Sequence, residues 1–179
     1  MKQQNYYART EINQRATNED HYNVFGVSLK RAKPGQQCGV KILVVADGMG
    51  GHEHGEDVSR QAVLKIEDFL KKTLTSDLHD LNKPAHLKAE LLNAIKSANT
   101  LVQRMRQANG WAEAGSTIVV AGICENTVVA ANLGDSPMMH FTHRTKDLLR
   151  VTQDHSVPGI VEFCPMQRTC LRSILSAFR

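Results

Sequence analysis

The strongest constraint on how this chain folds is an apolar segment, residues 42–46, that ends on Asp47 and is followed by Gly48, Gly50 and Gly51. Five consecutive apolar residues predict a fully buried strand. Glycines leave room beside the main chain and adopt backbone angles closed to other residues. Mg²⁺ and Mn²⁺ prefer carboxylate, carbonyl and water oxygens as ligands. The segment therefore predicts a strand that ends at a cation site.

Composition predicts one globular domain without nucleic-acid or membrane binding. The chain has 179 residues, of which 41% are hydrophobic, which suits one cored domain. No apolar run approaches the roughly 20 residues that span a bilayer. The first residues lack the apolar core of a signal peptide, so we expect a cytoplasmic protein. The net charge of +4 comes from scattered basic residues and only 5% of residues are aromatic, which argues against a nucleic-acid partner.

The cysteines carry no recognisable site. None of the four forms a CxxC pair, so they predict neither a zinc site nor a disulfide framework. They are Cys38, Cys124, Cys164 and Cys170.

The order of the predicted elements favours an antiparallel α+β fold. Two strands, residues 24–29 and 40–46, form a hairpin around the turn at Pro34. Two amphipathic helices follow, one at about 57–75 and one from Pro84 to Gly110. Their apolar stripes predict core residues: Val58, Ala62, Ile66, Phe69, Leu70, Leu87, Leu91, Ile95, Ala98, Val102 and Met105. Further strands are predicted at 117–123, 127–133, 138–141 and 148–151, an order that parallel βαβ repeats would not produce.

A second acidic cluster, Asn18-Glu19-Asp20, lies just before the first strand. If the first two strands pair, the start of one lies beside the end of the other, which brings Glu19 and Asp20 to Asp47. Carboxylates that close repel one another unless a cation neutralises them. Arg15 beside such a centre suits an incoming phosphate, because a guanidinium binds two oxygens at once. The alternative is a solvated turn with Arg15 as a surface charge.

Four blocks, in order, resemble the metal-dependent serine/threonine protein phosphatases of type 2C. The blocks are residues 15–20, the strand with residues 47–52, residues 115–136 and residues 152–156. The resemblance covers residues 9–156 and implies a sandwich of two antiparallel sheets flanked by helices, in α-β-β-α layers. Met49 follows Asp47-Gly48, at a position where eukaryotic members often carry histidine. In this respect the chain resembles the bacterial branch.

The resemblance also implies a site with two divalent ions, Mn²⁺ or Mg²⁺. Asp47 would bridge the ions, the Gly48 carbonyl would ligate one, and Glu19 would hold the centre directly or through water. Asp135 matches a position that in some members helps to hold a third, labile ion. The implied catalytic residues are Asp47 and Asp20, and Arg15 would bind the substrate phosphate. A metal-activated water would attack phosphorus in phosphoserine or phosphothreonine proteins, the products of a serine/threonine kinase.

Several residues depart from the family pattern. Pro137 stands where members usually carry arginine, and Met49 cannot donate a proton to a leaving group. His52 and His54 are interpreted as solvated loop residues. Further metal-binding aspartates are expected downstream, but no aspartate or asparagine follows Asp154. We therefore expect residues 9–156 to be the N-terminal part of a phosphatase domain with a divergent tail, 157–179, and a truncated or altered C-terminus.

Two alternatives to the active phosphatase remain open. One is a catalytically dead, truncated pseudophosphatase that at most binds phosphoproteins through Arg15. The other reads residues 52–57 as a near miss of the H-x-H-x-D-H motif of metallo-β-lactamase-like hydrolases. This chain has Glu56 and Asp57 where the motif requires an aspartate and a histidine, which leaves the zinc ligands incomplete.

Overall fold

The computed structural model describes residues 6–12, 14, 17–29, 38–49, 54–76, 84–124 and 127–155. Arg15, His52 and the predicted turn at Pro34 lie outside the described residues, as does the tail 157–179.

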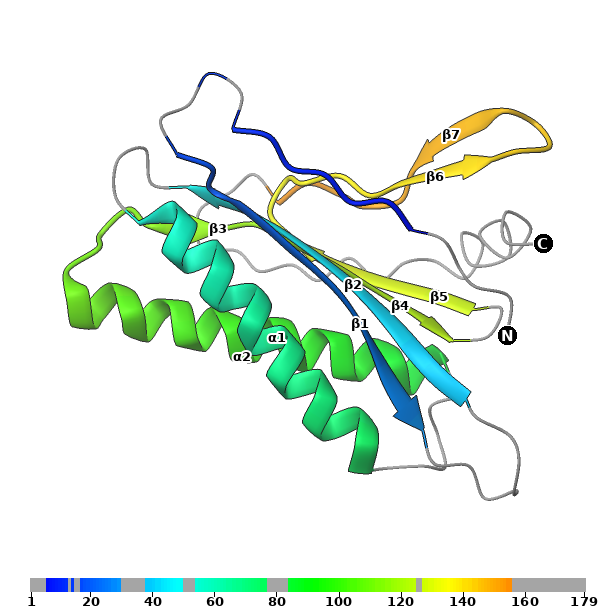
Figure 1. Ribbon diagram of the computed structural model, residues 1–179, viewed down its shortest axis with the longest axis horizontal. Coiled ribbons are helices and arrows are strands. Elements are labelled where there is room, and N and C mark those ends of the chain that lie inside the picture. The colour runs from blue at the N-terminus through cyan, green and yellow to red at the C-terminus, as the bar shows by residue number, and fades with distance from the viewer. Residues whose placement is uncertain are drawn as a thin grey trace.

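The described strands form two antiparallel sheets (Figure 1). The larger has the order β1 (Asp20–Leu29), β2 (Cys38–Met49), β4 (Ile118–Cys124) and β5 (Thr127–Leu133). The short β3 (Gly115–Ser116) pairs with the end of β2. The smaller sheet is the pair β6 (Met139–Thr142) and β7 (Asp147–Arg150). The predicted α+β class and the predicted pairing of the first two strands are confirmed.

Both described helices, α1 (Gly55–Ser76) and α2 (Pro84–Asn109), cover the same face of the larger sheet (Figure 1). The predicted apolar stripes face the sheet, except that Phe69 and Met105 are only half-buried. In β2 every second residue points at the helices, and the apolar ones are Val40, Ile42, Val44 and Ala46. The prediction that this strand is fully buried was wrong at Val45, which is 49% exposed on the other face. The helices cover only one side of the strand.

The other face of the sheet has its own small apolar cluster over β4 and β5. Ala121, Val128 and Ala130 are buried there against Met138 and Val151, which flank the β6–β7 pair. The Val151 N–H donates to the Met138 carbonyl at 2.8 Å, and the Met138 N–H donates to Thr152 Oγ1 at 2.9 Å. These contacts fix the smaller sheet, β6–β7, on the side of the larger sheet opposite the helices (Figure 1).

The strands extend further than the apolar pattern predicts. β1 begins at Asp20 rather than Val24, and β2 continues to Met49 rather than ending at Ala46. Backbone pairing continues through the polar residues, because ladder hydrogen bonds need no apolar side chains. Asp20 and Asp47 therefore both lie within the β1–β2 ladder. No described helix is long and apolar enough to span a membrane.

A glycine in β4 lets α2 approach the sheet closely. A Cβ on Gly122 would lie 3.1 Å from Leu87 Cδ2, and Leu87 is only 1% exposed. We expect Leu87→Ala to lower the free energy of unfolding by about 2–5 kcal/mol, the usual cost of the lost contacts and the cavity. Leu64→Ala is the matched control: Leu64 is 45% exposed on α1, so its loss should cost less than about 0.5 kcal/mol. Urea unfolding followed by circular dichroism measures both, and equal losses would contradict this packing.

Candidate active site

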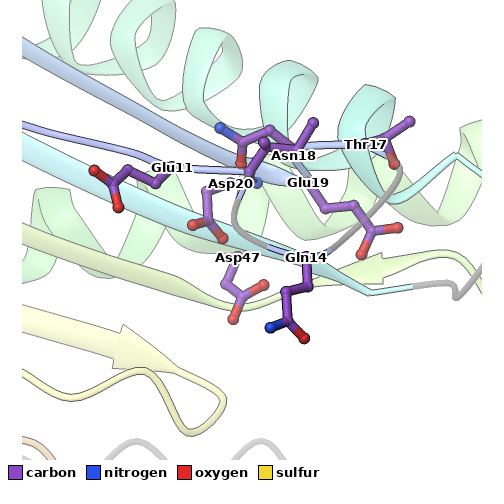
Figure 2. A pocket seen from close by; sticks show the side chains of 8 residues that line it. Glu11, Gln14, Thr17, Asn18, Glu19, Asp20 and Asp47 are labelled. Carbon is purple, nitrogen blue, oxygen red and sulfur yellow. Dashed lines mark hydrogen bonds between the residues drawn. The ribbon is translucent and has the colours of Figure 1, made fainter.

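Two carboxylates face each other across the first strand pair. Asp20 is the register partner of Asp47 in the β1–β2 ladder, and both side chains are exposed. Directly opposed residues on one face of an antiparallel pair have Cβ atoms about 4.5–5.5 Å apart. Both line a pocket of about 390 Å³ with Glu19, Asn18 and Thr17. Figure 2 shows the two aspartate side chains lying next to each other, one from each strand.

Glu19 is held through its backbone carbonyl. The Gly48 N–H donates to this oxygen at 3.0 Å, and the Ser59 hydroxyl donates to it at 2.6 Å. One carbonyl thus joins β2 and α1 to the residue that precedes β1. The Glu19 side chain leaves in a different direction from that of Asp20 (Figure 2). Its carboxylate lies at the start of α1, where a Cβ on Gly55 would be 3.0 Å from Oε1.

Gly48 is required by a close approach of backbones. A Cβ on Gly48 would lie 2.2 Å from the Gly55 carbonyl oxygen and 2.8 Å from that of Glu19. Its φ is not in the left-handed region, so its conformation alone does not demand glycine. The sequence interpretation invoked unusual angles and room for a ligand. The structure shows instead that α1 fills the space beside this glycine; Gly50 and Gly51 lie outside the described residues.

The backbone of Asp47 is fixed on both sides by β3 and the residue after it. The Thr117 N–H donates to the Asp47 carbonyl at 2.8 Å, and the Asp47 N–H donates to Thr117 Oγ1 at 3.2 Å. The Ser116 hydroxyl lies 3.2 Å from the same Asp47 carbonyl, but its nearer acceptor is the Thr117 carbonyl at 2.8 Å. Thr117 Oγ1 also lies 2.6 Å from Ser136 Oγ, in hydrogen-bond contact. Asp47 is therefore connected to the turn that carries Asp135.

That turn is supported by the last of the four sequence blocks. Gly134 has a φ of 98°, in the region that favours glycine, and packs on Thr117. Its carbonyl accepts a hydrogen bond from the His155 N–H at 3.1 Å. Arg150 pairs with Asp154 and donates to the Asp135 carbonyl at 3.1 Å. Residues 152–155 thus support the turn, and Asp135 is not among the described residues that line the pocket of Asp20.

His54 is exposed, as expected of a solvated loop residue, and it also contacts two neighbours. Its ring stacks on Trp111 with a centroid distance of 4.0 Å, and its Nδ1 lies 3.5 Å from Asp57 Oδ2. Its carbonyl accepts the Val58 N–H at 3.0 Å, so it caps the start of α1. Its φ of 69° is uncommon for a residue other than glycine. These contacts describe a residue that anchors the helix start.

The donors at this rim fit a hard divalent cation in kind. Asp20 and Asp47 offer adjacent carboxylates in one pocket, and a cation between them would relieve their repulsion. Mg²⁺ is often held by one or two carboxylates, with waters and substrate phosphate completing its shell. Within the described ranges, however, no three His, Cys, Asp or Glu side chains are grouped to hold a metal ion. The pair therefore suits one part of a metal centre.

Sequence reasoning missed the residues that hold this site together. Gly55, Ser59, Thr117 and Ser136 were given no role, although each contacts Glu19, Asp47 or their neighbours. One indication of the role of Ser59 was present in the sequence, which is its position on the apolar stripe of α1. In the structure Ser59 is 1% exposed. A hydroxyl on a buried helix face needs a hydrogen-bond partner, and the Glu19 carbonyl is that partner.

Residues 16–166 match the protein phosphatase 2C family. The chain belongs to this family. The match includes every site residue that the sequence predicted except Arg15, which directly precedes it.

Bacterial phosphatases are among the relatives. The chain is 34% identical over 116 residues to serine/threonine phosphatase stp of Listeria welshimeri, covering 65% of this chain and 44% of that protein. It is 26% identical over 148 residues to protein phosphatase PhpP of Streptococcus pneumoniae, covering 83% and 54%. Serine/threonine phosphatase Stp1 from Staphylococcus aureus aligns with a TM-score of 0.58 at 29% identity, over 80% of this chain and 50% of that structure. The chain spans about half the length of the curated relatives it matches.

The crowding at Gly48 can be tested by a substitution to alanine, with the same substitution at an uncrowded glycine as the control. Gly48→Ala places a methyl group within 2.2 Å of the Gly55 carbonyl oxygen, so α1 has to move. We expect a loss of about 1–3 kcal/mol or more in the free energy of unfolding. A Cβ on Gly26, in β1, meets nothing within 4 Å, so Gly26→Ala should be tolerated. Urea unfolding compares the two, and a neutral Gly48→Ala would refute the close approach.

Proposed function

We propose that this chain carries the acidic part of a phosphatase site that removes phosphate from phosphoserine or phosphothreonine proteins with the help of Mn²⁺ or Mg²⁺. The observation that carries the proposal is the pairing of Asp20 with Asp47 in one pocket at the rim of the sheet. Membership of the protein phosphatase 2C family supports it. The names of the relatives as serine/threonine phosphatases support the substrate class.

The residues have distinct tasks in this proposal. Asp47, Asp20 and the Gly48 carbonyl hold divalent metal, and Glu19 contributes directly or through water. When bound, the metal lowers the pKa of a water and neutralises phosphoryl charge. Thr117 fixes the Asp47 main chain, which keeps its carboxylate at the pocket. Binding of the substrate phosphate falls to Arg15, and Asp135 is proposed for a labile third ion.

The setting of the activity is part of the proposal. The substrates are phosphoproteins produced by a serine/threonine kinase in the cytoplasm. The products are inorganic phosphate and the free hydroxyl of the protein. Water attacks phosphorus, and the serine or threonine oxygen leaves and takes up a proton.

Metal binding is testable without activity. Mn²⁺ should raise the melting temperature of the wild-type chain, because a ligand that binds only the folded state stabilises it. Asp47→Asn removes one of the two facing carboxylates and should abolish most of that rise. The control is Asp68→Asn, which changes an exposed α1 carboxylate that pairs with Lys72. Equal Mn²⁺ responses in wild type and Asp47→Asn would refute this site.

A second candidate function is a pseudophosphatase that binds phosphoproteins without turnover. One observation favours it: within the described residues, no three His, Cys, Asp or Glu side chains are grouped to hold a metal ion. Few anionic ligands mean weak metal binding, which limits catalysis.

Hydrolysis separates the two candidates. We expect the full chain at saturating Mn²⁺ to release phosphate from a phosphothreonine peptide, and Asp47→Asn to lose that release. No release by wild type, with the peptide still bound, would favour the pseudophosphatase. Arg15→Ala should weaken peptide binding under either candidate, because the guanidinium is the proposed phosphate ligand.

A further inference from the structure

Ser59 is a buried hydroxyl that no part of the proposed chemistry uses. It lies on α1, one turn after Gly55, and is 1% exposed. Its oxygen lies 2.6 Å from the Glu19 carbonyl and 3.0 Å from the Glu56 carbonyl of its own helix. A hydroxyl has one proton to donate. The shorter contact, to Glu19, joins α1 to the acidic rim across 40 residues of sequence.

The carbonyl that Ser59 contacts belongs to the peptide between two site residues. This peptide connects Glu19 to Asp20, so any shift of the peptide displaces both side chains. Its oxygen also accepts the Gly48 N–H at 3.0 Å, which comes from the residue after Asp47. One oxygen atom thus sets the positions of the Glu19 and Asp20 side chains relative to Asp47.

We propose that the Ser59 hydroxyl is a positioning group that holds the Glu19–Asp20 peptide in the geometry needed for divalent metal. The proposal rests on the proposed function. Ser59 does not touch metal or substrate; it acts through the carbonyl of Glu19. Partners that orient metal ligands typically contribute 10–100-fold to metal affinity or activity.

The structure also predicts that the fold survives the loss of this hydroxyl. The Glu19 carbonyl keeps the Gly48 N–H as a donor, so no buried acceptor is left without a partner. The strand pair β1–β2 keeps its ten register partners from Asp20 to Leu29. Freedom of the peptide, rather than unfolding, is therefore the expected consequence.

The test measures Mn²⁺ affinity on the full chain from the electron paramagnetic resonance signal of free Mn²⁺. We expect Ser59→Ala to weaken binding by about 10–100-fold. Ser59→Thr keeps the hydroxyl and should bind closer to wild type than Ser59→Ala does. Thr100→Ala is the matched control, since Thr100 also donates a side-chain hydrogen bond to a helix carbonyl, that of Lys96 at 3.0 Å, but is exposed on α2. Its affinity should equal that of wild type.

The outcomes separate this inference from the proposed function. Wild-type binding with equal affinity in Ser59→Ala overturns the positioning role alone. No Mn²⁺ binding by folded wild type overturns the proposed function, and the inference with it. If circular dichroism shows Ser59→Ala to be unfolded, Ser59→Val replaces it and is compared with Ser59→Thr, because valine has the shape of threonine but no hydroxyl to donate. Equal affinity in folded Ser59→Val and Ser59→Thr overturns the inference as well.

Discussion

The pairing of β1 with β2 is the interaction on which the rest of the site depends. It sets Asp20 directly opposite Asp47, on the face of the sheet that the helices do not cover. Two exposed carboxylates at that distance repel each other, and the ladder holds them together against this repulsion. This repulsion costs little free energy at an exposed rim. A cation between the two carboxylates would remove the repulsion by neutralising their charge. The backbone register therefore brings together the two carboxylates that the proposed cation site needs.

Hydrogen bonds around this pair converge on backbone atoms rather than on carboxylates. The Glu19 carbonyl accepts hydrogen bonds from the Gly48 N–H and the Ser59 hydroxyl, and the Asp47 carbonyl accepts one from the Thr117 N–H. Fixing the main chain sets where a side chain starts while leaving its oxygens available to a ligand shell. This arrangement is what preorganisation of a site requires, since supporting contacts decide how closely ligands keep their geometry.

Much of the fold followed from local patterns. The 3.6-residue periodicity identified both helices and most of their buried residues, and the turn signals identified the β1–β2 hairpin. The pattern failed at Val45, since five apolar residues in a row do not reveal which face is covered. It also missed the strand ends at Asp20 and Met49, because ladder pairing extends past apolar side chains. The stacking of the exposed His54 on Trp111 was not predicted, because the two residues are distant in sequence.

By itself the sequence determined the acidic and glycine residues of the rim, the order of the blocks and the family resemblance. These are local properties of residue type and spacing, so the chain carries them without being folded. Only the tertiary structure decided that Gly48 is a packing residue, that Ser59 reaches the Glu19 carbonyl, and that Thr117 joins Asp47 to the turn at Ser136. Such contacts join residues that are far apart in the chain, so they form only when the helices and the sheet pack against each other.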